Sequence, residues 1–462
     1  MQIISDICNL FWGDLFYLPL PGGGSIGISL LVALLIPTGI YFTVRTGFLP
    51  IRLFPEMLRL SVQKKSGGRT GALSGLQALI ISTATRVGTG NMVGVVAAVS
   101  AGGPGAVFWM WITALIGSST AYVEATLAQQ HKREDALYGG YCGGPAYYIH
   151  DFFTRNKEKK HHFLAVAFAL SGLLCWCGVS QVISNSVSSA FDYAFGTPPI
   201  VSTVILVALA AFVVLRKNAT VKVLDVMVPV MASFYFLIAV YVILTNAAAL
   251  PAVMERIVKE AFGLRQMAAG GFGAALMNGV KRGLFSNEAG SGSAPCAAAA
   301  ADVSHPAKSG LIQAFGVFID TLVICSCTAF IMLLAPEEKL AGLSGMPLLQ
   351  EAMNHHFGQA GVIFTAIALW LFCFSTFIGI LYYARGNVSY LFGNSWKAQN
   401  IYKIVALVML FVGGLAAYTF VWELGDIGVA LMTVFNLIAI LPMGGRAIAA
   451  LREYCAIPKE ER

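Results

Sequence analysis

The sequence predicts an all-α integral membrane protein with eleven transmembrane helices. Of its 462 residues, 57% are hydrophobic and only 11% are charged. A typical soluble domain carries roughly 25% charged residues, so a soluble globular fold is excluded. The apolar residues gather in long runs, and an α-helix needs about 20 such residues to cross a bilayer. The Lys and Arg residues cluster in alternate connections between these runs, as they do in multi-pass membrane proteins.

The eleven runs are interpreted as membrane-spanning helices because they are long and weakly charged. In chain order they cover about 25–46, 72–100, 106–130, 163–190, 198–215, 223–246, 264–285, 308–335, 358–384, 400–417 and 423–443. The stretch 50–65 carries Arg52, Glu56 and Arg59 among apolar residues, so we expect an amphipathic helix at the membrane surface. The segment 286–306, rich in Ala, Gly and Ser, is expected to pack on the inner face.

The basic residues orient the chain in the membrane. With the N-terminus outside, 25 of the 30 Lys and Arg residues fall in inner connections, 4 fall in outer ones, and Arg86 is left within a span. Because cytoplasmic loops are enriched in Lys and Arg, this predicts a bacterial inner (plasma) membrane protein with a cytoplasmic C-terminus. No clustered basic face suggests a nucleic-acid partner.

The sequence offers no obvious enzymatic or metal chemistry. All seven His lie at expected helix ends or in loops, and no His-Glu-x-x-His motif occurs, so we expect no transition-metal site and no haem. The Cys pairs 175/177 and 325/327 lie in apolar runs and are interpreted as small buried side chains. We expect no enzyme activity, because no His or Cys/His pair is placed as nucleophile and base, and we expect no cofactor.

Two of the predicted spans contain dense glycine. The second carries Gly88, Thr89, Gly90 and Asn91, and the seventh carries the run 270–273. Glycine interruptions at corresponding places in two halves of a chain indicate a transporter site, because broken backbone frees carbonyl and amide groups at mid-membrane depth. The simpler alternative is close helix packing through small residues.

The ninth span suggests a cation site. Phe372 precedes Ser375 by three residues and Thr376 by four, so on a helix its carbonyl lies beside both hydroxyls. Three oxygens at one point suit a small hard cation if carbonyls of a broken helix complete the shell. The alternative is that the two hydroxyls only bond back to their own helix.

Three ionisable residues are expected within the hydrocarbon region: Arg86, Glu124 and Asp320. Each is costly there unless paired or hydrated, so each is a functional candidate. The alternative is a structural ion pair of Arg86 with Glu124 or Asp320.

Further charges are expected near the inner face. There, Glu288 and Asp302 could form gate contacts with Lys281 or Arg282.

The chain resembles the alanine or glycine:cation symporter family over about 70–450. The resemblance rests on RVGTGNMVG at 86–94, GVKRGLFSNEAG at 279–290, VFIDT at 317–321, FST at 374–376, and Gln181 with Asn185. It implies a leucine-transporter-type fold with two inverted five-helix repeats after one extra helix. The implied divisions are 1–71 (N-terminal and interfacial helices), 72–246 and 247–445 (the repeats) and 446–462 (cytoplasmic tail).

The resemblance also implies site residues. A sodium ion would be held by carbonyls of Ala84 and Val87 together with Phe372, Ser375 and Thr376. The amino acid would contact the first break and a small pocket formed by Thr85, Gly88, Thr89, Gly90, Asn91, Phe272, Gly273, Met277 and Trp370. One departure concerns the inner end of the ninth span, where the family pattern suggests Gly-Glu and this chain has Ala384-Arg385.

Together these features predict a sodium-coupled symporter that imports a small neutral amino acid, alanine or glycine, by alternating access. One alternative is proton coupling through Glu124 or Asp320. Another is an amino-acid-gated sensor or channel, which would require a continuous polar pore lining. The sequence predicts no oligomeric state.

Overall fold

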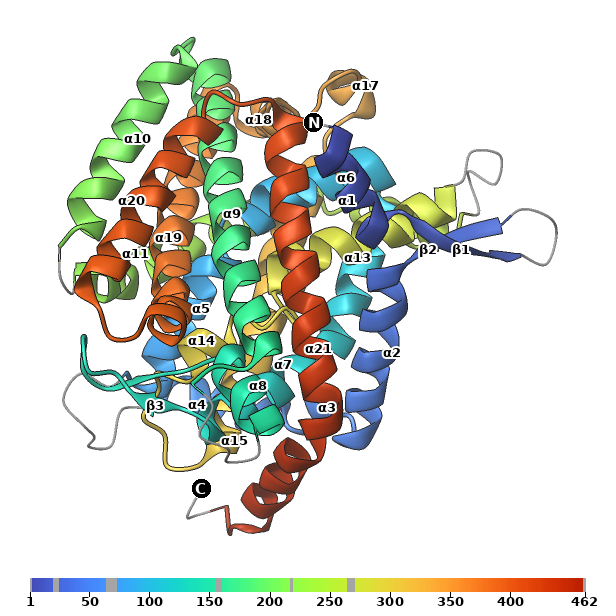
Figure 1. The fold of residues 1–462 in the computed structure, drawn as a ribbon. Coiled ribbons are helices and arrows are strands. Elements are labelled where there is room, and N and C mark those ends of the chain that lie inside the picture. The colour runs from blue at the N-terminus through green and yellow to red at the C-terminus, as the bar shows by residue number, and fades with distance from the viewer. Residues whose placement is uncertain are drawn as a thin grey trace.

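The computed structural model describes residues 2–19, 25–63, 73–154, 160–216, 219–263 and 271–459. Long helices form one bundle, with two short antiparallel hairpins at its periphery. In Figure 1 the N-terminus, α17 and α18 mark one end of the bundle, here called the upper end. The C-terminus, α4, α8 and β3 mark the opposite, lower end.

The N-terminal region is more elaborate than the sequence predicts. It consists of α1 (Gln2–Trp12), the hairpin β1 (Asp14–Pro19) and β2 (Ser25–Ser29), α2 (Leu30–Arg45), α3 (Leu49–Arg52) and α4 (Phe54–Ser61). The helix predicted over 25–46 therefore begins five residues later than expected, because residues 25–29 form β2 and pair with β1. Ser29 then caps α2 by accepting a hydrogen bond from the Val32 amide at 3.2 Å. A short amphipathic helix does occur within 50–65, with Met57 and Leu60 of α4 buried.

The next part of the chain contains the first predicted break. Its elements are α5 (Gly75–Arg86), the π-helical turn η1 (Gly90–Gly94), α6 (Val95–Gly102), α7 (Gly105–Gln130), β3 (Arg133–Glu134), β4 (Tyr141–Cys142), α8 (Pro145–Thr154), α9 (Phe163–Phe195), α10 (Pro199–Val214) and α11 (Ala219–Thr245). A capping box starts α5, since Ser74 and Gln77 exchange two hydrogen bonds of 3.0 Å. The helix then stops at Arg86, and residues 87–89 separate it from η1.

The remaining elements complete the bundle. They are α12 (Leu250–Ala261), α13 (Gly271–Asn287), α14 (Pro295–Ala298), α15 (Pro306–Val317), η2 (Phe318–Cys325), α16 (Ser326–Leu333), α17 (Glu337–Leu340), α18 (Met346–Phe357), α19 (Gln359–Phe392), α20 (Trp396–Gly413) and α21 (Tyr418–Ala456). Helix α9 packs against both α19 and α21, and α7 packs against α13 and α15.

Every predicted span overlaps a helix in the described residues. Six of these helices are long and apolar enough to cross a membrane: Gly105–Gln130, Phe163–Phe195, Val223–Thr245, Pro306–Leu333, Gln359–Phe392 and Tyr418–Ala456. Shorter apolar helices include Leu30–Arg45, Gly90–Gly102 and Pro199–Val214. The protein is therefore a multi-pass, all-α membrane protein.

The structure describes only part of the seventh predicted span. Its residues 264–270 lie outside the described part of the chain, and residues 271–273 form the first turn of α13. An interruption that the sequence did not predict follows Asn287, and residues 288–294 are here called the second break.

The predicted C-terminal tail differs as well, because α21 continues to Ala456. Ala447, Leu451 and Tyr454 are buried on this extension, and the Tyr454 hydroxyl is hydrogen-bonded to Glu56 of α4. Packing against α4 gives the extended helix a partner, so it does not end where the apolar run ends.

Candidate functional site

A small cavity lies between the two breaks, at the centre of the bundle. Its volume is about 30 Å³, which is room for one or two waters. Thr85, Thr89 and Gly90 line it from the first break, and Glu288 and Ser291 line it from the second. The rest of its wall comes from α9, α13, α19 and α21, chiefly through Cys175, Trp176, Val179, Leu284, Phe285, Ile380 and Val429. The cavity thus has polar groups at the breaks and an apolar wall elsewhere.

The first break is held open by its own side chains. The side-chain Oδ1 of Asn91 accepts a hydrogen bond from the Gly88 backbone amide at 2.9 Å, and its side-chain Nδ2 donates to the Asp320 carboxylate at 2.8 Å. Gly90 faces Ser286 so closely that a Cβ on residue 90 would lie 2.7 Å from the Ser286 Cα. The two broken segments therefore touch at a point where only glycine fits.

The second break corrects the expectation that 286–306 packs on the inner face. Glu288, Gly290 and Gly292 have positive φ values of 59°, 92° and 81°, which end α13 and turn the chain through the bundle core. The Glu288 carboxylate accepts hydrogen bonds from the hydroxyls of Tyr383 (3.2 Å) and Thr85 (3.4 Å). Glu288 is therefore a cavity residue and not a surface charge.

The predicted cation ligands come together beside this cavity. The Phe372 carbonyl lies 2.8 Å from the Ser375 hydroxyl and 2.9 Å from the Thr376 hydroxyl. The Ala84 carbonyl, at the end of α5, lies 3.4 Å and 3.3 Å from the same two hydroxyls. Four oxygens from two elements nearly 300 residues apart in sequence thus converge, and Gly88 packs directly against Thr376. No described contact places the Val87 carbonyl in this cluster.

The buried charges are arranged differently from the expected ion pair. Arg86 is fully buried, and its Nη1 donates to the Gln313 carbonyl at 3.3 Å. Within the described residues it makes no ion pair, and its Nε and Nη2 find no hydrogen-bond partner. Glu124 instead accepts from the Asn436 amide at 2.8 Å and from the Gly290 amide. Both carboxylates predicted to pair with Arg86 therefore have neutral partners.

Asp320 is enclosed by hydrogen-bond donors. Besides Asn91, the hydroxyls of Ser286 (2.9 Å) and Thr321 (2.7 Å) donate to its carboxylate. Neither Asp320 nor Glu124 lines the cavity, whereas Glu288 does.

Six predicted substrate contacts do not line the cavity: Gly88, Asn91, Phe272, Gly273, Met277 and Trp370. Phe272, in the first turn of α13, packs on Trp109 with ring centroids 5.8 Å apart. The Trp370 ring stacks on Phe374 at 5.1 Å, one turn along the same helix. Asn91 uses both ends of its side-chain amide within the protein.

Other lining residues were not identified from the sequence. Trp176 on α9 and Phe285 on α13 supply the aromatic wall, and Ser291 and Ser293 supply hydroxyls from the second break. A sequence signal for this break is the Gly290-x-Gly292 pair, which follows one residue after the Asn287-Glu288 dipeptide at the end of a helix-length run.

An ion-pair cluster lies immediately above the cavity. Arg282 of α13 binds both carboxylate oxygens of Asp426 on α21, each at 3.0 Å, and Lys281 binds the same carboxylate at 2.7 Å. The Arg282 guanidinium also lies 4.0 Å from the centroid of the Trp422 ring. Lys281 and Arg282 therefore do not pair with Glu288 or Asp302, and they face the α1 end of the bundle because Trp12 lies beside them.

The cavities of the protein form a series from end to end. Toward the upper end, a cavity of about 690 Å³ is lined by the C-terminal turns of α9 and by Tyr418. Along α21, Tyr418 is followed by Trp422, Asp426 and then Val429 of the central cavity. Toward the lower end, α19 lines first the central cavity, then a narrow space of about 10 Å³, and then a lower cavity of about 290 Å³.

The chain is similar in sequence to known amino-acid transporters. The chain is 44% identical to the probable sodium/glutamine symporter GlnT of Bacillus subtilis (92% of this chain, 88% of that protein). It is 41% identical to the amino-acid carrier protein AlsT of the same organism (99% and 93%). It is also 35% identical to the sodium/alanine symporter AgcS of Methanococcus maripaludis (93% and 95%).

Solved structures share the fold. That of MhsT in complex with L-phenylalanine aligns with a TM-score of 0.60 at 13% identity, over 83% of this chain and 97% of that one. A mutant manganese transporter of Eremococcus coleocola aligns at 0.52 and 12% identity, over 84% and 81%. The leucine-transporter-type fold is thereby confirmed. A family model described as the sodium:alanine symporter family matches residues 24–462, and since that family consists of transporters, the expectation that the protein is not an enzyme is also confirmed. The chain belongs to the sodium:alanine symporter family.

Proposed function

We propose that the protein imports a small neutral amino acid, alanine or glycine, together with sodium. The observation that carries this proposal is the convergence of the Ala84 and Phe372 carbonyls with the Ser375 and Thr376 hydroxyls, beside a cavity lined by both helix breaks. Oxygen ligands of this kind suit a hard cation. The names of the relatives, which include sodium symporters of alanine and glutamine, support the same class of function.

The groups that line the cavity suit a zwitterion, although the cavity itself would have to widen to admit one. The substrate carboxylate would meet backbone amides near Thr89 and Gly90, where η1 begins, because helix N-termini favour anions. The ammonium group would meet the Glu288 carboxylate. The side chain would lie against Trp176 and Phe285, and the small volume of the cavity favours a short side chain.

Sodium would order the first break. In the present arrangement the two hydroxyls donate to the carbonyls of Phe372 and Ala84. With a cation bound, the same hydroxyls would turn their lone pairs toward it. Because Gly88 packs on Thr376, sodium would then fix the segment that contacts the substrate, and each ligand would raise the affinity for the other.

Proton coupling remains a second candidate, through a different residue from those predicted. Glu124 and Asp320 are fully buried away from the cavity, whereas Glu288 lines it. A substrate-linked proton would therefore be carried by Glu288.

We further propose that the upper end faces outward and the lower end faces the cytoplasm of a bacterial cell, so that the N-terminus is outside. Described basic residues at the lower end support this, among them Arg59 of α4, Arg133 of β3 and Arg452 of α21, whereas Lys281 and Arg282 lie on the upper side. The eleven crossings and the inverted repeats over 72–246 and 247–445 belong to the same proposal. Transport would then proceed by alternately opening the two ends around the central cavity.

Uptake of labelled alanine into proteoliposomes tests the proposal. An inward sodium gradient is expected to drive uptake, and an equal potassium gradient is not. Thr376→Ala should abolish the sodium dependence, while Thr376→Ser should retain it. Thr365→Ala is the matched control, because Thr365 donates a comparable hydrogen bond (2.8 Å, to Gly361) on the same helix but away from the site. Uptake that follows a proton gradient and ignores sodium would overturn the sodium assignment and direct attention to Glu288.

A further inference from the structure

Arg385, which departs from the family pattern, lies in the lower part of the cavity series. Thr376 and Ile380 of α19 line the central cavity, Tyr382 and Arg385 line the narrow space, and Ser389 and Tyr390 line the lower cavity. At 1.5 Å per residue, Arg385 lies about 13 Å below Thr376 along the helix. Arg385 therefore occupies the constriction between the candidate site and the lower cavity.

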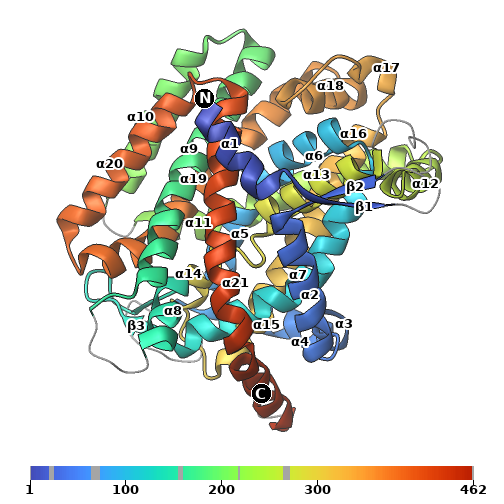
Figure 2. The same ribbon diagram turned by 45° about the vertical axis from the view of Figure 1, so that its right-hand side comes forward.

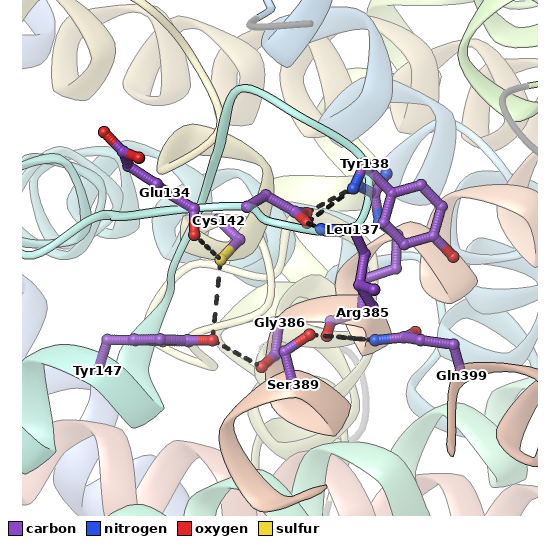
Figure 3. A network of polar contacts seen from close by, with 10 residues as sticks. Glu134, Leu137, Tyr138, Cys142, Tyr147, Arg385, Gly386, Ser389 and Gln399 are labelled. Carbon is purple, nitrogen blue, oxygen red and sulfur yellow. Dashed lines mark hydrogen bonds and ion pairs between the residues drawn. The ribbon is translucent and has the colours of Figure 1, made fainter. Parts of the chain in front are cut away.

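A single carboxylate holds Arg385 across this constriction. Its Nη2 lies 2.9 Å from the Asp135 Oδ2, and the Asp135 side chain is 4% exposed. Asp135 follows β3 in the hairpin that connects β3 and β4. Its other oxygen accepts the backbone amides of Leu137 and Tyr138, both at 2.9 Å, so the carboxylate is held rigidly by the turn (Figure 3). The ion pair thus joins the β3–β4 hairpin to α19.

Aromatic and backbone contacts complete the junction. The Arg385 guanidinium lies 3.4 Å from the centroid of the Tyr138 ring and 4.6 Å from that of Tyr382. Gln399 of α20 donates to the Arg385 carbonyl at 3.1 Å, and Tyr147 of α8 donates to the Gly386 carbonyl at 3.1 Å (Figure 3). The backbone of α19 is therefore anchored to α8 and α20, and the Arg385 side chain is what ties the hairpin to it.

We propose that the Arg385–Asp135 pair, stacked on Tyr138, is the inner gate of this transporter. Closed, it seals the central cavity from the lower cavity of about 290 Å³. Opening would separate the hairpin from α19 and connect the two spaces. The charge of residue 385, opposite in sign to the Glu of the family pattern, is matched in this chain by Asp135. The inference rests on the alternating access proposed above, but its test needs neither the substrate nor the coupling ion.

A native cysteine reports on this gate. Cys142 of β4 lines both the narrow space and the lower cavity. Burial and the nearby Asp135 carboxylate raise the pKa of the Cys142 thiol to about 11, and the charges of Arg385 and Arg133 oppose that increase. Loss of either arginine would therefore make the thiol less reactive by electrostatics alone, whereas opening of the gate would make it more reactive.

The experiment measures the labelling rate of Cys142 by a hydrophilic maleimide in the purified full-length protein, with the modified peptide quantified by mass spectrometry. Arg385→Gln is expected to label about fivefold faster or more than the wild type, since breaking an interaction of one or two kcal/mol changes populations by that order. Arg385→Lys, which keeps the charge, should stay within about twofold of the wild type. Arg133→Gln is the matched control, because Arg133 pairs with Asp151 at 2.6 Å and not with Asp135.

Equal or slower labelling of Arg385→Gln, like that expected of Arg133→Gln, would overturn the proposal. If Arg385→Gln does not fold, Tyr138→Leu replaces it, since it removes the stacking and keeps the ion pair. That variant should label faster than the wild type, and unchanged labelling would equally overturn the proposal. A failure of alanine uptake with intact gate behaviour would instead count against the proposed substrate.

Discussion

Ion pairs lie both above and below the central cavity, but they are built differently. Above, one carboxylate, Asp426, holds two cations and joins α13 to α21. Below, one carboxylate, Asp135, holds the single cation Arg385 and joins the β3–β4 hairpin to α19. The upper cluster carries one excess positive charge, whereas the lower pair is neutral.

This difference indicates which residue is essential to each ion-pair cluster. Above, either cation can be lost while the other still neutralises Asp426. Below, the pair has no such reserve, and its strength comes from the fixed turn around Asp135 and the Tyr138 ring. We therefore expect the upper closure to be most sensitive at its carboxylate and the lower closure to be sensitive at both partners. Figure 2 shows α21 running down the middle of the bundle beside α1, with α13, to which the upper cluster joins it, on its right.

The largest expected effect comes from Asp426→Ala. It leaves Lys281 and Arg282 without their shared partner in the protein interior, and removing one partner of a buried pair costs about 3–5 kcal/mol. Thermal unfolding in detergent should shift strongly downward, and alanine uptake should be lost. Glu423→Ala, three residues earlier on α21, is the control. Equal melting temperatures and equal alanine uptake in the two variants would contradict the importance of Asp426 in the upper cluster.

A smaller loss is expected from Gly90→Ala, which tests whether the two breaks must touch between the closures. The new Cβ would lie 2.7 Å from the Ser286 Cα, so the segments must separate at a cost of about 1–3 kcal/mol. Alanine binding, measured by scintillation proximity, should weaken at least tenfold. Gly94→Ala is the matched control, because a Cβ there meets nothing within 4 Å. Normal binding by Gly90→Ala would argue against contact between the breaks at the site.

The two cations of the upper cluster should differ in importance. Arg282→Gln removes a bidentate pair and a stacked ring, so we expect a loss of about 1.5–3 kcal/mol in unfolding free energy. Lys281→Gln, which removes one ion-pair contact and a more distant ring (5.3 Å from the Trp12 centroid), should cost about 1 kcal/mol or less. Equal losses from the two substitutions, by chemical denaturation, would contradict the assignment of Arg282 as the main cation.

The smallest effect is expected from Asp151→Asn. Asp151 pairs with Arg133 and His131 at the lower end, and this contact does not lie between the cavities. Burial alone would raise the pKa of Asp151, but the hydrogen bond from His131 and the charge of Arg133 outweigh it and hold that pKa below its ordinary value. The ionised carboxylate therefore stabilises the fold above about pH 4, and the stabilisation is lost as pH falls through the folded pKa. The small difference in melting temperature between wild type and variant should vanish below that pH, with transport unchanged. A transport defect in Asp151→Asn would contradict the expectation that this ion pair stabilises the fold and takes no part in the gate.

Much of this architecture could be predicted from the chain. The length and apolarity of the runs identified the helices, and the spacing of Phe372, Ser375 and Thr376 identified a carbonyl with two hydroxyls because helix geometry fixes that relation. The first break was visible for a related reason, since Gly88 and Gly90 interrupt an otherwise apolar span.

The second break could not be located in the same way. Residues 271–273 of the glycine run start a helix, whereas the turn at 288–294 depends on three positive φ values, which composition does not distinguish from close packing. The ion-pair partners of the charged residues could not be predicted from the sequence either. Asp426 and Arg282 are 144 residues apart, Asp135 and Arg385 are 250 apart, and only the angles between helices bring them together.

The most direct test of the account is the affinity for alanine at increasing sodium concentration, measured by equilibrium binding to the purified protein. If the cation and substrate share the segment around Gly88, sodium should tighten alanine binding, and alanine should tighten sodium binding by the same factor, because coupling free energies are reciprocal. Thr376→Ala should remove this linkage. Alanine binding that is the same in sodium and in potassium would contradict the account.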